Sequence, residues 1–203
     1  MPVRLDYQMI EEYVPDGAAV LDLGCGDGTL LGQLIEEKGC SGIGVDNDLA
    51  QVHRCIARGV PVYHGDMLEA MEMFEEGRFD CVVLSQTLQQ TPQPDRVVQE
   101  MLRVGRRAII SFPNFAHWRV RCKFVFTGRM PVTGVLPYTW YETPNIHLLT
   151  IKDFLDFCRE QGLRVLDTIY LSPGYKVLPG FLANLTASLA IFVVEREAEG
   201  GSG

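Results

Sequence analysis

The stretch Asp22-Leu-Gly-Cys-Gly-Asp-Gly28 decides the fold of this 203-residue chain. It overlaps the apolar run 19–23, which is typical of a buried parallel strand, and a helical pattern of leucines and isoleucine follows over 29–37. A strand that turns through glycines into a helix opens many α/β proteins that bind nucleotides or nucleosides. The glycines of this turn follow the pattern G-x-G-x-G.

Strand and helix patterns continue to alternate up to residue 112. We expect further strands at 41–46, 61–64, 78–84 and 107–112, with helices at 49–58, 69–76 and 95–104. Such an order predicts a doubly wound, Rossmann-like α/β sheet of five parallel strands, which binds ligands outside the carboxyl ends of its strands. The residues expected at that edge are Asp22, Asp46, Asp66, Ser85 and Pro113.

The segment 113–149 interrupts the alternation. It holds four prolines, both tryptophans and little regular pattern, so we expect an aromatic insertion that covers the pocket or docks a partner. Its cations lie among aromatic residues, as in many protein interfaces.

The chain after the insertion predicts one helix and two strands. Thr150 is the expected N-cap of a helix at 151–161, with Asp153 completing a partial capping box. Two strands at 164–171 and 188–196 are expected as an antiparallel pair at the sheet edge. We therefore predict a single domain over 1–196, with a disordered tail at 197–203.

The composition of the chain indicates which classes of partner are not expected and in which compartment the protein works. The net charge of −8 argues against a nucleic-acid partner. The sequence lacks the apolar run of a signal peptide or a spanning helix, so we expect no membrane partner. Six scattered cysteines without a C-x-x-C pair predict reduced thiols in a cytoplasmic protein and no metal site.

The spacing of the glycines distinguishes between cofactors. A dinucleotide fingerprint, G-x-G-x-x-G, would place its third glycine at position 29, where this chain has threonine. A dehydrogenase is therefore the least favoured alternative. S-adenosylmethionine has no pyrophosphate, and it presents an ammonium, a carboxylate, a sulfonium and a ribose instead. We expect this pocket to hold S-adenosylmethionine or its demethylated product, S-adenosylhomocysteine.

Three aspartates are the expected polar partners of that cofactor. Asp22 would pair with the ammonium, Asp46 would accept hydrogen bonds from the ribose hydroxyls, and Asp66 from the adenine amino group. The alternative for any one of these acids is a helix cap. The other residues that we expect at the cofactor are Gly24, Cys25, Gly26, Asn47, Met67 and Ser85.

The second half of the chain carries a more specific resemblance. The stretches Ser111-Phe-Pro-Asn-Phe-Ala-His-Trp-Arg119, Thr127-Gly-Arg-Met-Pro-Val-Thr133 and Leu136-Pro-Tyr-Thr-Trp-Tyr-Glu-Thr-Pro-Asn-Ile-His147 resemble the signature of the methionine-biosynthesis protein MetW family. The similarity extends to about residue 196. It implies the class I methyltransferase fold and association with homoserine O-acyltransferase (MetX), which forms O-acylhomoserine.

The resemblance leaves open whether the chain has catalysis of its own. No G-x-S-x-G elbow is present, so we expect acyl transfer to occur on the partner, with this chain as an activating or regulatory subunit. The alternative is an active methyltransferase on a small molecule, with His117 or His147 as general base. Both histidines could equally form structural hydrogen bonds. A homodimer is a further assembly that we consider.

Overall fold

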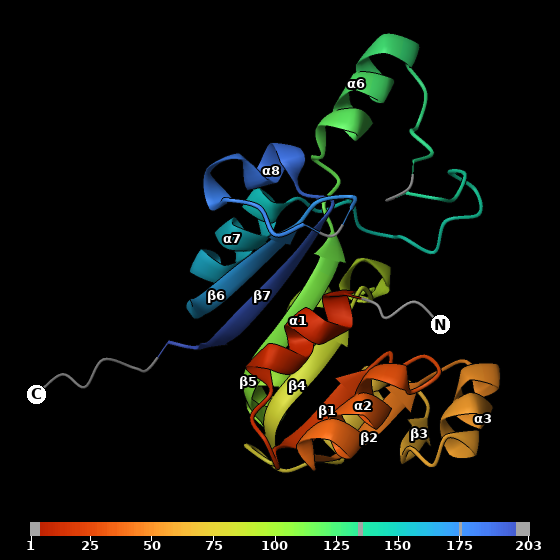
Figure 1. Ribbon diagram of the computed structural model, residues 1–203, viewed down its shortest axis with the longest axis vertical. Coiled ribbons are helices and arrows are strands. Elements are labelled where there is room, and N and C mark those ends of the chain that lie inside the picture. The colour runs from red at the N-terminus through yellow and green to blue at the C-terminus, as the bar shows by residue number, and fades with distance from the viewer. Residues whose placement is uncertain (1–4, 134–135, 175, 198–203) are drawn as a thin grey trace, which may run out of the picture.

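The computed structural model describes residues 5–133, 136–174 and 176–197 (Figure 1). Except for Glu197, the predicted tail lies outside these residues. The strands form one seven-stranded sheet in the order β3-β2-β1-β4-β5-β7-β6. In chain order they are β1 (Ala19–Leu23), β2 (Ser41–Asp46), β3 (Val62–His64), β4 (Phe79–Ser85), β5 (Gly105–Pro113), β6 (Leu163–Leu171) and β7 (Leu189–Arg196).

The predicted sheet is confirmed. The first five strands run parallel, and β7 lies antiparallel between β5 and the edge strand β6. The eight α-helices found in the described residues are α1 (Leu5–Tyr13), α2 (Thr29–Lys38), α3 (Leu49–Ala57), α4 (Met67–Glu72), α5 (Pro94–Val104), α6 (Trp118–Thr127), α7 (Ile151–Glu160) and α8 (Ala183–Thr186).

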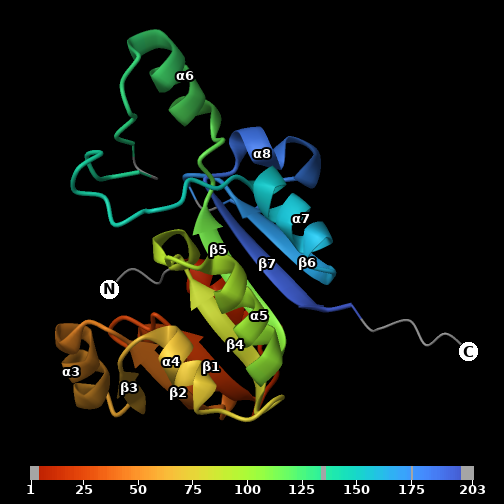
Figure 2. The ribbon, with the colours of Figure 1, turned by 180° about the vertical axis from the view of Figure 1, so that it is seen from behind.

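Helices cover both faces of the sheet because its strands are apolar on both sides. One core cluster joins the sheet to α1, α2 and α3, which face the viewer in Figure 1. The other joins it to α4, α5 and α7, seen in Figure 2. This burial holds the carboxyl ends of the parallel strands at one edge, where the loops that follow them meet.

Several helical segments differ from the sequence expectation, among them α4, which is expected at 69–76, and an unexpected 3-10 turn at Leu88–Gln90. Helix α1 was not expected, and neither was the short stretch before β7 that contains α8 and a 3-10 turn at Gly180–Leu182. The expected irregular insertion contains α6, which stands out from the sheet (Figure 1). The predicted Thr150 cap is confirmed, since Thr150 and Asp153 form a capping box at the start of α7.

Candidate functional site

Two adjoining pockets lie at the carboxyl edge of the parallel strands. The first has a volume of about 510 Å³, and the loops that follow β1, β2, β3 and β4 line it. The second, of about 540 Å³, extends from the glycine loop toward α1 and the segment 137–145. The two pockets share the residues Gly24, Gly26, Gln51 and Gln90.

The glycine loop after β1 forms the wall between these pockets. Gly24, Gly26 and Gly28 all have φ values near +60 to +70°, a conformation that favours glycine. The backbone N–H groups of Gly24 and Cys25 both donate to the carbonyl of Val45, at 2.8 and 3.1 Å. A Cβ on Gly26 would meet no atom within 4 Å, so this residue faces open space where a ligand can approach the backbone.

Asp46 ends β2 and fixes the loop from the opposite side. Its Oδ2 accepts a hydrogen bond from Gly26 N at 2.8 Å, and its Oδ1 accepts one from Asp48 N at 2.9 Å. Each carboxylate oxygen has two acceptor sites, so both keep capacity for a hydroxyl donor in the first pocket. Asp46 can therefore brace the loop and bind a ligand at once.

Asp22 lies below the loop, two residues before Gly24. It is 2% exposed, and it is not among the described residues that line either pocket. Burial and the charge of Asp46 raise the pKa of Asp22 to about 7. A cation bound above the loop would stabilise its ionised form.

Asp66 and Met67 line the far end of the first pocket. Asp66 is also the N-cap of α4, where its Oδ1 accepts hydrogen bonds from Leu68 N and Glu69 N. The helix-cap role considered for this residue is thus present. It leaves Oδ2 without a hydrogen bond from the described part of the chain. Met67, with Leu68 and Val97, adds apolar surface to the same pocket.

Cys25 lines the second pocket and packs against Cys55 of α3, with 3.8 Å between the two Sγ atoms. The Cys55 thiol donates to the carbonyl of Gly26 at 3.1 Å. Burial raises the pKa of both thiols. We therefore read this pair as protonated thiols that pack behind the loop.

The turn after β4 borders both pockets. Gln86 has a φ of +53°, the one positive value among the described residues other than glycine. Five hydrogen bonds hold Gln86. Its N–H donates to both the carbonyl and the hydroxyl of Ser111, and its side chain donates to Asp6 of α1. Its carbonyl accepts from the side chains of Gln89 and Gln90. Strain held this firmly is typical of a functional site.

Of the nine residues expected at a cofactor, eight line at least one of the two pockets, and Asp22 lines neither. Asn47 lines the first pocket and Ser85 the second. The sequence did not predict several further lining residues. Thr87 and Gln90 follow β4, and the rule that ligands bind beyond strand ends could have found them. Tyr7 and Tyr138 come from α1 and the insertion, and no local pattern indicated either.

The two candidate bases lie elsewhere. His117 is buried, and its Nδ1 accepts a hydrogen bond from Arg119 N at the start of α6. Burial and the nearby Arg119 charge lower its pKa. His147 lines a third, more apolar pocket, beside Phe154 and Phe157 of α7. Neither histidine lines the first or second pocket, so a catalytic role for them stays a prediction.

No described part of the chain gathers three metal-binding side chains, and no described helix is long and apolar enough to cross a membrane. The first pocket also has an uneven charge. Among its described lining residues are the carboxylates Asp46, Asp48 and Asp66, but no lysine or arginine. This pocket suits a ligand with hydroxyl groups or positive charge better than it suits a phosphate.

Solved structures assign the fold. A methyltransferase from Archaeoglobus fulgidus that depends on S-adenosylmethionine superposes with a TM-score of 0.70 at 14% identity, over 95% of this chain and 92% of its own. The [4+2]-cyclase SpnF superposes with a TM-score of 0.68 at 18% identity, over 95% of this chain and 80% of its own. The chain has the class I methyltransferase fold, which by itself does not specify a reaction.

The family follows from sequence comparison. The model of the methionine biosynthesis protein MetW matches residues 4–194, and the chain belongs to this family. The bifunctional methionine biosynthesis protein MetXA/MetW of Rhodopirellula baltica is 33% identical over 96% of this chain. The chain spans only 33% of the length of that relative. A ubiquinone biosynthesis O-methyltransferase of Leptothrix cholodnii is 26% identical over 80% of this chain and 71% of its own length.

Proposed function

We propose that this chain binds S-adenosylmethionine or S-adenosylhomocysteine and acts with homoserine O-acyltransferase as an activating or regulatory subunit. The observation that carries the proposal is the relative in which a MetXA part and a MetW part form one bifunctional protein. Parts that are fused in one organism commonly associate as separate chains in another. Acyl transfer would then occur on the partner, and the ligand bound here would modulate it.

The chemistry of the first pocket supports the choice of ligand. Asp46 offers acceptors to two ribose hydroxyls, and Met67, Leu68 and Val97 offer apolar contact to an adenine ring. Asp66 Oδ2 suits an amino group. The open side of Gly26 lets the methionine part approach the loop backbone. Burial raises the pKa of Asp22 to about 7, and a nearby cation such as an ammonium would stabilise the ionised carboxylate.

Asp46 provides the sharpest test of this pocket. Asp46→Ala should weaken S-adenosylhomocysteine binding by about 1–3 kcal/mol, because it removes the acceptors for the ribose hydroxyls. Isothermal titration calorimetry measures the change. Asp46→Asn keeps one acceptor oxygen, so its affinity for S-adenosylhomocysteine should lie between those of the wild-type chain and Asp46→Ala. An unchanged affinity of Asp46→Ala would show that the ligand binds elsewhere.

The regulatory role is tested on the partner's reaction. We expect the homoserine acyl-transfer rate of the matching acyltransferase to change when this chain is added, and the two proteins to co-elute from a sizing column. Saturating S-adenosylmethionine should then alter that rate or the affinity of the complex. Separate elution with an unchanged rate would refute the subunit role. A complex that does not respond to the ligand would refute only the regulation.

A methyltransferase activity of its own is the second candidate function. The similarity to a ubiquinone biosynthesis O-methyltransferase and the adjoining second pocket, which has room for a small acceptor, favour it. Transfer of a labelled methyl group to a metabolite, lost in Asp22→Ala, would support this candidate. Asp27 is the carboxylate lining the second pocket, and it is already bound to Arg58 and Thr29. This arrangement offers no obvious base and makes the activity the less favoured of the two.

A further inference from the structure

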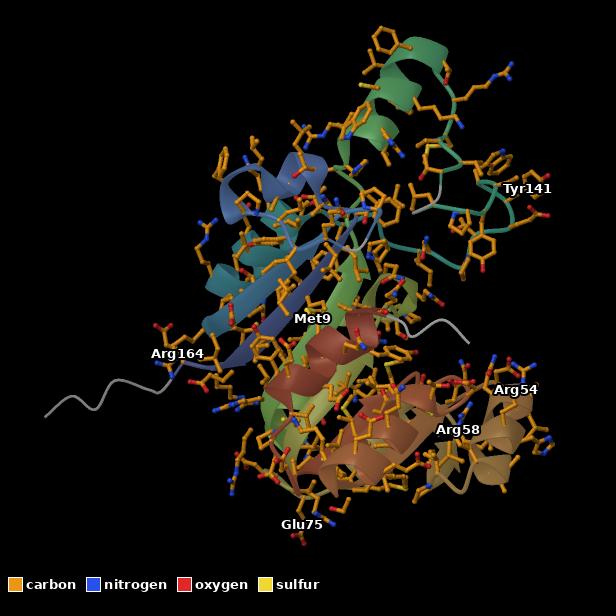
Figure 3. All side chains as sticks on the ribbon, in the orientation of Figure 1. Met9, Arg54, Arg58, Glu75, Tyr141 and Arg164 are labelled. Carbon is orange, nitrogen blue, oxygen red and sulfur yellow. The ribbon has the colours of Figure 1, made fainter. Side chains whose placement is uncertain are left out.

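The segment after β5 leaves an unusual amount of apolar surface uncovered. We call residues 117–141, without 134 and 135, the arm; it contains α6 and the chain that loops beside it (Figure 1). All ten residues from 121 to 130 are exposed. Trp140 and Tyr141 are exposed as well, and Tyr141 lies on the outer side of the arm (Figure 3). Apolar residues gathered in this way mark an interaction surface.

The pattern along α6 indicates the shape of what covers it. Trp118, Cys122 and Val125 follow one side of the helix at spacings of four and three residues, while Val120 and Phe124 follow another side. Arg121 separates the two stripes on one flank, and Arg119 and Lys123 on the other. A flat surface such as a membrane covers only one side of a helix. Two stripes require a groove with two walls, which a folded protein provides.

The charge of the arm indicates the chemistry of that groove. No aspartate or glutamate occurs from Met101 to Tyr141, in a chain that holds 26 of them. The arm carries the cations Arg119, Arg121, Lys123 and Arg129. Arg121 and Lys123 donate hydrogen bonds to the carbonyls of Ala116 and Val132, and the Arg119 guanidinium lies over the Trp118 ring at 5.4 Å from its centroid. A complementary groove is apolar along its floor and acidic along its rims.

We propose that the arm is the surface that docks the acyltransferase, with α6 seated in an acidic, apolar groove of that enzyme. This inference rests on the function proposed above and names the contact that it requires. The alignment with the relative that carries both parts spans 96% of this chain, and the family model spans residues 4–194, so the arm lies inside both matched spans. The matched span therefore includes the arm in a relative whose two parts belong to one protein.

Two exposed phenylalanines allow a test with a matched control. Phe124 and Phe126 of α6 are 52% and 84% exposed, whereas Phe181, outside the arm, is 83% exposed. The double variant Phe124→Ser, Phe126→Ser should raise the Kd for the matching acyltransferase at least tenfold, because exposed aromatic residues dominate docking affinity. Phe181→Ser should leave the Kd unchanged. Circular dichroism confirms that both variants keep the fold.

Cys122 gives an independent readout on the unaltered helix. It is exposed on α6, whereas the other five cysteines are buried. Saturation with the acyltransferase should slow its modification by a maleimide at least tenfold. Two outcomes would overturn the arm as docking surface and leave the proposed function intact, provided that the wild-type chain binds the acyltransferase. In one, the double variant binds with the same affinity as the wild-type chain. In the other, the acyltransferase does not protect Cys122.

The remaining outcomes also decide the question. If the wild-type chain does not bind the acyltransferase at all, the proposed function and this inference both fail. If Cys122 is protected by rising concentrations of this chain alone, and the double variant abolishes that protection, the arm is covered by a second copy and the inference is wrong. Protection by anionic phospholipid vesicles, without an effect of the acyltransferase, would assign the arm to a membrane surface instead.

Discussion

Asp22 couples the stability of the folded chain to the pH of the solution. Its pKa is about 7 in the folded chain and near 3.8 in the unfolded one. Between these values the folded state holds a proton that the unfolded state releases, so stability from this group falls as pH rises from about 4 to about 7. The shift corresponds to at most about 4 kcal/mol. A bound cation would stabilise the carboxylate and so reduce the loss of stability at high pH.

Asp22→Asn should therefore flatten the pH profile of stability without ligand. The wild-type chain should lose more unfolding free energy between pH 5 and pH 8 than the variant does, since asparagine does not ionise. Urea unfolding followed by circular dichroism at both pH values measures the difference. Parallel losses in the two proteins would show that Asp22 ionises at its ordinary pKa.

Gly24 illustrates a position where backbone and packing exclude a side chain together. Its φ is +66°, and a Cβ would lie 2.7 Å from Oγ1 of Thr87. Gly24→Ala should therefore cost more stability than Gly39→Ala, where φ is +63° but a Cβ meets nothing within 4 Å. We expect about 1–2 kcal/mol for Gly39→Ala from the left-handed backbone alone. Gly24→Ala should cost at least about 1 kcal/mol more, because it adds an overlap. Equal unfolding free energies would show that Thr87 moves aside freely.

Among the helices, α7 depends on its cap. Thr150 Oγ1 accepts from Asp153 N, and Asp153 Oδ2 accepts from Thr150 N. Thr150→Ala should lower stability by about 1 kcal/mol and the Tm by about 2–4 °C. Thr127→Ala, at the exposed end of α6, should change it by less than about 0.5 kcal/mol. Similar values for both variants would contradict a role of the capping box.

The element that sequence reasoning missed most clearly is α6. A helix is recognised by one apolar stripe that a core buries, and Trp118–Thr127 has two stripes and buries neither. By contrast, β1 and β2 begin and end where the sequence predicts. Each is a short apolar run that ends at an aspartate or before a glycine, and such a run is typical of a buried strand. Patterns thus predicted the elements that build the core. The apolar side chains of α6 are not buried by this chain, so the core pattern that predicts the other helices does not apply to it.

At the scale of the whole molecule, the sequence predicted five parallel strands with a C-terminal antiparallel pair, but not the position of each strand in the sheet. It also predicted six of the residues that line the first pocket. Parallel strands end at the same edge of a sheet, so the sequence places Asp46 and Asp66 at the first pocket and Ser85 beside the second. The second pocket was predicted only where the glycine loop and Ser85 line it. It joins Tyr7 of α1 to Tyr138 and Asn145 of the insertion, and only the packing of distant segments brings these residues together.

The distribution of thiols gives a test of the overall packing. Five of the six cysteines are buried and Cys122 is exposed. In its native state the chain should react with one equivalent of Ellman's reagent, and with six in denaturant. The native reaction should disappear in Cys122→Ser. More than one rapid equivalent in the native state would show that at least one of the five buried cysteines is accessible to the reagent.

Both tryptophans of the chain, Trp118 and Trp140, lie in the arm, and both are exposed. Indole emission depends on the water around the ring, so the tryptophan fluorescence of this protein, excited where tyrosine does not absorb, reports mainly on the arm and little on the sheet. Unfolding curves recorded by tryptophan fluorescence should therefore respond only weakly to the transition that circular dichroism detects. The same property supplies a built-in optical probe: any molecule that covers the arm should shift the emission to shorter wavelength without a label.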